Sequence, residues 1–102
     1  MSSSPVAGLD AIIHAPVRLA IMSRLVRGDE VEFTALKEAV DTTDGNLSTH
    51  AAKLEKAGYI KVRKRFVAKR PQTLFRITSK GQSAFLDYLS ALQKLLPPNR
   101  DG

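Results

Sequence analysis

The sequence predicts one α+β domain that is mostly α-helical, with a small antiparallel sheet of two or three strands. Apolar residues recur at helical spacing in four segments, and the pattern changes to alternation with a period of two after residue 58. The length of 102 residues suits a single hydrophobic core. We expect the domain to occupy residues 9–96, between a flexible N-terminus (1–8) and a flexible tail (97–102).

The first helix is expected to begin at Pro16, because proline suits a first helical position, where its missing amide needs no partner. Gly28 should end it. Its apolar side consists of Leu19, Ile21, Met22, Leu25 and Val26. Arg18 falls inside this apolar arc, so we expect its stem to pack and its charged head to reach water. His14 is interpreted as a cap or packing residue, not as a metal ligand.

Two short helices joined by a polar turn are expected in the middle of the chain. The first should run from an N-cap at Thr34 to Val40. The second should begin at Thr43 or Asp44, whose side-chain oxygens accept from first-turn amides, and should end at Gly58. Its buried stripe consists of Leu47, Ala51 and Leu54. This arrangement is a helix-turn-helix.

The exposed side of the second helix carries residue types that suit DNA. The candidate DNA-binding residues are Thr43, Asn46, Ser48, Thr49, His50 and Lys53. Short hydrogen-bonding side chains meet base edges in a major groove, while lysines further along the helix reach phosphates. The imidazole of His50 titrates near neutrality and would make binding pH-dependent. An ordinary solvated helix face is the alternative interpretation.

Positive charge is concentrated in the second half of the chain. The net charge is +6, but the segment from Lys53 to Arg76 contains nine basic residues and one acidic residue, so the remainder has a net charge of −2. Such clustering is typical of a surface that binds nucleic acid. The segment from Asp29 to Asp41 has five acidic residues and one basic residue, so it should face away from DNA.

Alternation of apolar and basic residues predicts a β-hairpin between Ile60 and Ile77, with its tip near residues 68–72. Val31–Phe33 would add a short strand. Behind a helix-turn-helix such a hairpin is a wing, which contacts phosphates or an adjacent minor groove. Its candidate DNA contacts are Arg63, Lys69 and Arg70. A charged hairpin that protects a sheet edge from aggregation is the alternative. The sequence assigns no role to Phe66 and Val67.

A last helix is expected over residues 79–96, capped by Thr78 and stopped by Pro97 and Pro98. The candidate dimerisation residues are Phe85, Tyr88, Leu89, Leu92 and Leu96. Together with Ala91 and Leu95 they form a stripe wider than one small domain covers, so we expect part of it to pack against a second copy. The alternative is a helix that folds back over its own domain.

Five segments carry a resemblance to a known family. They are HAPVRLAIMSRL (14–25), FTALKEAV (33–40), TDGNLSTHAAKLEKAGYI (43–60), FVAKRPQTLFRIT (66–78) and SKGQSAFLDYLSAL (79–92). The chain resembles the winged helix-turn-helix transcription regulators of the MarR and ArsR type, in particular their small single-domain members. The third segment is the most specific.

The resemblance implies a homodimer that binds a roughly palindromic operator and represses or activates transcription. The family's recognition-helix positions fall on Asn46, Ser48, Thr49, His50 and Lys53, and its wing positions on Lys69 and Arg70. Ala51 departs from the pattern, because relatives commonly have leucine there. The cysteine ligands of metal-sensing members are absent, so a metal response is not implied.

The expected function is therefore that of a sequence-specific regulator, most simply a repressor, that binds double-stranded DNA as a homodimer. A winged-helix protein-interaction module and a sequence-neutral architectural DNA binder are the alternatives. Without cysteine or a glycine-rich phosphate loop, the sequence indicates no enzyme, cofactor or metal site. It names no small-molecule effector. No apolar run approaches the ~20 residues that span a bilayer, and no signal peptide is evident, so we expect a cytoplasmic protein.

Overall fold

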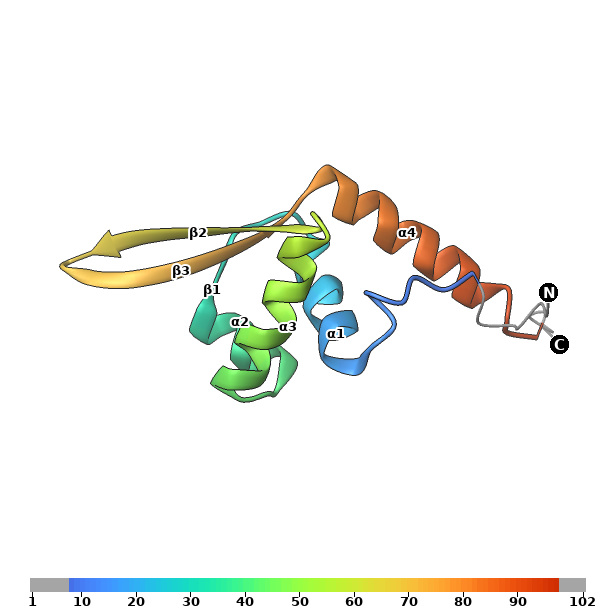
Figure 1. Ribbon diagram of the computed structural model, residues 1–102, viewed down its shortest axis with the longest axis horizontal. Coiled ribbons are helices and arrows are strands. Elements are labelled where there is room, and N and C mark those ends of the chain that lie inside the picture. Colours follow the sequence, from blue (N-terminus) through green and yellow to red (C-terminus); the bar gives the residue numbers. More distant parts are fainter. Residues whose placement is uncertain (1–7, 98–102) are drawn as a thin grey trace, which may run out of the picture.

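The computed structural model describes residues 8–97 and contains four α-helices and a three-stranded antiparallel sheet (Figure 1). The elements are α1 Pro16–Leu25, β1 Val31–Glu32, α2 Phe33–Val40, α3 Asp44–Lys56, β2 Ile60–Val67, β3 Arg70–Ile77 and α4 Ser79–Gln93. The predicted α+β class, its helix-turn-helix and its wing are confirmed. The flexibility expected of residues 1–7 and 98–102 lies outside the described residues.

The sheet has the order β1-β3-β2, with β3 in the centre. Its hairpin pairs from Ile60↔Ile77 to Val67↔Arg70, so the turn contains only Ala68 and Lys69. Both have positive φ, 51° and 65°, the backbone sign of the two-residue type I′ turn that matches strand twist. The tip is therefore tighter than the predicted 68–72.

Of the three helix starts for which a side-chain cap is predicted, two have that cap, and α1 begins at Pro16 as expected. The Oγ1 atom of Thr43 accepts from the amide of Asn46 at 3.1 Å, and Thr78 Oγ1 accepts from Gly81 at 2.9 Å, as predicted. The cap at Thr34 is wrong. Strand β1 runs straight into α2, so Glu32 occupies the cap position and the predicted third strand residue, Phe33, begins the helix.

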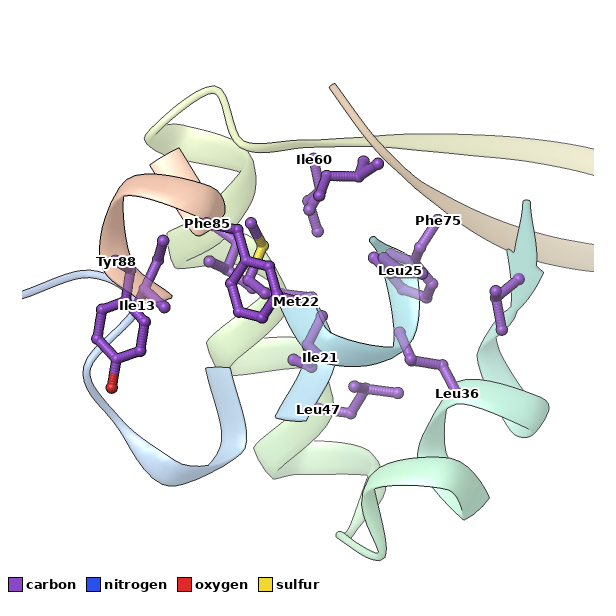
Figure 2. Packing of buried hydrophobic residues seen from close by; sticks show 14 residues of the cluster. Ile13, Ile21, Met22, Leu25, Leu36, Leu47, Ile60, Phe75, Phe85 and Tyr88 are labelled. Atoms are coloured by element: carbon purple, nitrogen blue, oxygen red, sulfur yellow. The ribbon is translucent and has the colours of Figure 1, made fainter. Parts of the chain in front are cut away.

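The hydrophobic core lies between α1, α2, α3, the inner face of the sheet and the first turns of α4 (Figure 2). Its largest fully buried side chains are Ile13, Ile21, Met22, Leu25, Leu36, Leu47, Leu54, Ile60 and Tyr88. Burial of each of these side chains contributes about 1.5–3 kcal/mol to the stability of the fold, relative to the same side chain left exposed. The predicted stripe on α3 is confirmed, since Leu47, Ala51 and Leu54 are all buried.

Helix α4 is anchored at its start and leaves the domain at its end (Figure 1). The carbonyl of Tyr59 accepts from the amide of Thr78 at 3.0 Å, and Thr78 Oγ1 donates to the carbonyl of Gly58 at 2.6 Å. Gly81 is buried against this turn, and a Cβ added there would overlap the Tyr59 carbonyl oxygen. This close approach joins α4 to the end of α3.

Phe85 and Tyr88 require a correction, because they pack inside the chain's own core. Their side chains are 4% and 2% exposed, and the two rings stack with centroids 6.5 Å apart. The Tyr88 hydroxyl also lies 2.8 Å from Nδ1 of His14, so the exposed His14 contacts the edge of this core. These contacts make the first half of α4 part of the domain. For this half, the structure agrees with the alternative that the helix folds back over its own domain. The apolar side chains left for a second copy lie on its outer side and beyond Gln93, where Leu96 follows the helix in a turn.

Candidate nucleic-acid interface

The outer face of α3 is polar and open to solvent. Asn46, Thr49 and Lys53 are exposed on it, opposite the buried stripe that fixes the helix to the core. Lys56 extends the same face into the last turn. The predicted order is therefore present in space, with short hydrogen-bonding groups near the N-terminus and cations towards the C-terminus. In a helix that lies in a major groove, the short polar groups near the N-terminus would contact base edges and the cations towards the C-terminus would contact phosphates.

Thr43 and Ser48 lie at the borders of this face. Thr43 uses its Oγ1 as the acceptor of the helix cap. Ser48 is exposed but turns towards the sheet, where it lines a hollow of about 420 Å³ together with Phe33 and Ala52. We therefore place both at the edge of the polar face, with Asn46 and Thr49 at its centre.

His50 is half-buried beside α1, and its Nδ1 atom lies 2.9 Å from Nη1 of Arg18. A guanidinium only donates, so this nitrogen accepts and the imidazole proton resides on Nε2. Burial, and then the charges of Arg18 and Lys53, hold the pKa of His50 below its usual value of 6.5. The neutral ring thus presents one N–H donor.

Arg18 does not reach freely into water as predicted. Its Nε atom donates to the carbonyl of Ile12, and its other end bonds His50. The stem crosses the apolar side of α1, but the head has protein acceptors on both sides. Arg18 therefore positions His50 on α3, a role that sequence reasoning missed because the two residues are 32 positions apart.

The wing has two different faces. Side chains alternate along β2, so Val62, Lys64 and Phe66 share the face turned towards α3, where Val62 and Lys64 line the hollow beside Ala51. The opposite face carries most of the wing's cations. They are Lys61, Arg63, Arg65, Arg70 and Arg76. The hairpin projects from the domain as an arm (Figure 1). By strand alternation Arg70 lies on the hairpin face opposite Val62 and Lys64, so it does not share a face with the side chains turned towards α3.

Arg63 is engaged within the domain and is not a free phosphate contact. Its guanidinium forms two hydrogen bonds with the Glu30 carboxylate, at 2.7 and 2.8 Å. The pair holds the pKa of Glu30 below its usual value and raises that of Arg63. Because Glu30 precedes β1, the pair ties the wing to this strand. A contact of Arg63 with DNA stays a prediction and would compete with this ion pair. Within residues 8–97, Lys69 and Arg70 at the tip form no salt bridge.

Comparison with known proteins decides the family. A model of the winged helix DNA-binding domain matches residues 17–96. The chain belongs to this family. An uncharacterized protein of Methanocaldococcus jannaschii is 37% identical over 84 residues, which cover 82% of this chain and 91% of that protein.

Solved structures share the same winged helix. A transcriptional regulator homologue from Pyrococcus horikoshii OT3 is 36% identical with a TM-score of 0.76, over 82% of this chain and 83% of that one. Reduced AbfR bound to DNA is 20% identical with a TM-score of 0.69, over 78% of this chain and 56% of AbfR. The second likeness is one of fold alone, and the chain spans little more than half of AbfR.

The small side chain of Ala51 accounts for the hollow beside α3 of this winged helix protein. The side chain is only 3% exposed, yet it borders the hollow with Ala52, Val62 and Phe75. A larger residue at position 51 would extend into this space. The small side chain therefore leaves a groove between α3 and the wing; the helix does not close fully onto the sheet.

Two further findings concern residues 8–97. This part of the chain holds no group of three or more His, Cys, Asp or Glu residues that could bind a metal ion. Its helices all fall short of the length and apolarity needed to cross a membrane. Lys37 on α2 pairs with Asp44 at 2.8 Å and offsets the charge of this acidic side chain in the first turn of α3.

Proposed function

We propose that this winged helix protein is a repressor that binds double-stranded DNA sequence-specifically, as a homodimer on a palindromic operator. The observation that carries the proposal is the outer face of α3, where Asn46, Thr49 and Lys53 are exposed on a helix whose other side is buried. Membership of the winged helix DNA-binding domain family supports it.

The recognition helix would read bases with its first two turns. Asn46 matches adenine, to which an asparagine amide forms a bidentate pair worth ~1–3 kcal/mol of discrimination. His50 would donate from Nε2 to a base acceptor, because Arg18 keeps the proton on that nitrogen. Lys53 and Lys56 would contact phosphates. Lys69 and Arg70 would extend the phosphate contacts at the wing tip.

Exposed leucines of the C-terminal segment support a dimer. Leu86, Leu89, Leu95 and Leu96 are 61%, 40%, 42% and 62% exposed. Leu86 and Leu89 lie three residues apart and therefore share one side of α4. Because α4 and the wing leave the domain in opposite directions (Figure 1), joining two copies through α4 leaves the wings at the outer ends. Two recognition helices would then face successive major grooves about 34 Å apart.

Repression would follow from occupancy. A dimer that covers two successive major grooves within a promoter excludes other proteins from the same DNA. In a transcription assay on a template that carries the bound sequence, we expect the transcript to decrease as protein is added. An increase would instead indicate an activator and would contradict this part of the proposal.

Selection from a random duplex pool tests the DNA function directly. We expect enrichment of a palindrome whose half-sites are one helical turn apart. A bound pool without a common sequence would indicate the architectural alternative, and failure to enrich any duplex at moderate salt would favour a protein-interaction module. Either result would refute sequence-specific regulation.

The dimer has a separate test. Leu89→Glu places a charge on the exposed apolar side of α4, so we expect the molecular mass in solution to fall from that of two copies to one. Ser90→Glu is the matched control, because Ser90 is exposed on a different side of the same turn. A wild-type protein with the mass of one copy would refute the dimer.

A further inference from the structure

Phe66 is the most exposed large apolar side chain in the described part of the protein, at 77%. It stands near the end of β2, directly opposite Pro71 on β3, and Pro71 is exposed as well. The adjacent turn at Ala68 and Lys69 holds the two strands together. The wing tip therefore presents two apolar side chains to solvent, and neither of them is part of the hydrophobic core.

The direction of this pair follows from strand alternation. Phe66 lies on the same face of the hairpin as Val62 and Lys64, which line the hollow beside α3. The tip thus turns an aromatic ring, and not its arginine, towards the side of the recognition helix. Phe66 is four residues beyond Val62, so it lies about 13 Å further along the strand at ~3.3 Å per residue.

The surroundings of Phe66 are strongly basic. Lys64, Arg65, Lys69 and Arg70 all lie within four positions of it and are all exposed. An apolar ring surrounded by cations complements a partner that is anionic outside and apolar inside. Duplex DNA has this build, because its phosphates flank a stack of base pairs, and the minor groove admits such a ring between two of them.

We propose that Phe66, supported by Pro71, inserts as a wedge between two base pairs from the minor groove that adjoins the major groove occupied by α3. Lys64, on the same face of the hairpin as Phe66, and Lys69, in the turn, contact the neighbouring phosphates. The wedge rests on the DNA-binding function proposed above. It partly unstacks one base step and kinks the duplex towards the major groove. Pyrimidine–purine steps deform most easily, so the wing gives the operator a sequence preference at a position that α3 never contacts.

The test uses the duplex enriched by selection, with 2-aminopurine placed in turn at each position outside the major-groove half-sites. This base fluoresces more strongly when it loses its stacking partner. With the wild-type protein we expect the fluorescence to rise at one step beside each half-site. With Phe66→Ala we expect no rise and about tenfold weaker binding, which corresponds to ~1.4 kcal/mol. The salt dependence should not change, because no cation is removed.

Two variants serve as controls. Val67→Ala changes the next residue, which is 44% exposed but lies on the other face of the strand, so it should keep both the affinity and the fluorescence rise. Phe66→Leu keeps an apolar wedge and should retain most of both. Because Phe66 is exposed, we expect the thermal midpoint of Phe66→Ala to match that of the wild type.

The outcomes separate the wedge from the function on which it rests. If the wild-type protein binds the selected duplex without a fluorescence rise at any position, or if Phe66→Ala binds as tightly as the wild type, the wedge is refuted and DNA binding stands. A reduced salt slope for Phe66→Ala also refutes the wedge, because it means that the ring only positions cations. If the wild-type protein enriches no duplex, the proposed function itself is refuted.

Discussion

Replacing Gly81 by alanine tests the junction that fixes α4 to the domain. A Cβ at this position would overlap the Tyr59 carbonyl oxygen and would lie 2.9 Å from the carbonyl carbon. Both atoms belong to the backbone, so neither can rotate away. The same oxygen accepts the amide of Thr78 at 3.0 Å, so a shift that relieves the overlap also weakens this hydrogen bond.

The magnitude follows from three contributions. Forcing a methyl group into a packed site costs about 1–3 kcal/mol, and we take the upper end because backbone must move. Loss of the Thr78 hydrogen bond adds about 1 kcal/mol. Alanine favours a helix over glycine by up to ~1 kcal/mol, which offsets part of the penalty. We expect Gly81→Ala to lower the free energy of unfolding by about 3–4 kcal/mol, or the thermal midpoint by ~12–30 °C.

Urea denaturation followed by far-ultraviolet circular dichroism measures this change. One fixed protein concentration is used, because the stability of the proposed dimer would depend on concentration. Gly45→Ala is the matched control. Gly45 also lies in the first turn of a helix, α3, but a Cβ there would meet nothing within 4 Å. We expect its free energy of unfolding to stay unchanged or to rise by up to ~1 kcal/mol. A Gly81→Ala protein as stable as this control would refute the close-packed junction.

Three further predictions concern charged and titrating groups. Glu30→Gln releases Arg63, so we expect tighter DNA binding with a salt slope steeper by roughly one phosphate contact; an unchanged slope would show that Arg63 does not reach DNA. Because the folded-state pKa of His50 lies below 6.5, the folded protein binds fewer protons than the unfolded chain as pH falls through this value. Wild-type stability should therefore decrease with acidification below 6.5 more than that of His50→Gln, and parallel urea-denaturation profiles would exclude the effect. Donation to Asp10 raises the pKa of Tyr59 from 10.0 to about 12, so the folded state keeps a proton that the unfolded chain loses. Between these two pH values the wild type should lose stability relative to Tyr59→Phe, and an equal loss in both would contradict the hydrogen bond's role.

The wing shows how tertiary pairing changes the meaning of a charge pattern. The sequence predicts a basic hairpin, and the hairpin is there, but its cations are not equivalent. Arg63 pairs with Glu30 and Arg76 donates to the carbonyl of Gly28 at 3.1 Å, so both brace the root of the wing. Lys69 and Arg70 remain at its tip. Net charge alone cannot distinguish these roles.

Local signals along the chain specify most of the helices and strands and the polar face of α3. Thr43 and Thr78 cap their helices through contacts three residues away, and alternation from Ile60 to Ile77 sets the hairpin. Each signal is local, because helix and strand periodicity and capping act over a few residues. Such signals also placed Leu47 and Leu54 on the buried side of α3.

The partners that these elements meet follow only from their packing in three dimensions. Arg63 finds Glu30 across 33 positions, Arg18 finds His50 across 32, and His14 meets Tyr88 across 74. No periodicity in the chain encodes such pairs, since they arise only when packing brings distant segments within hydrogen-bonding distance. The same packing took Phe85 and Tyr88 into the core and left Phe66 at the wing tip in water, because apolar spacing shows which face of an element is buried but not what covers it.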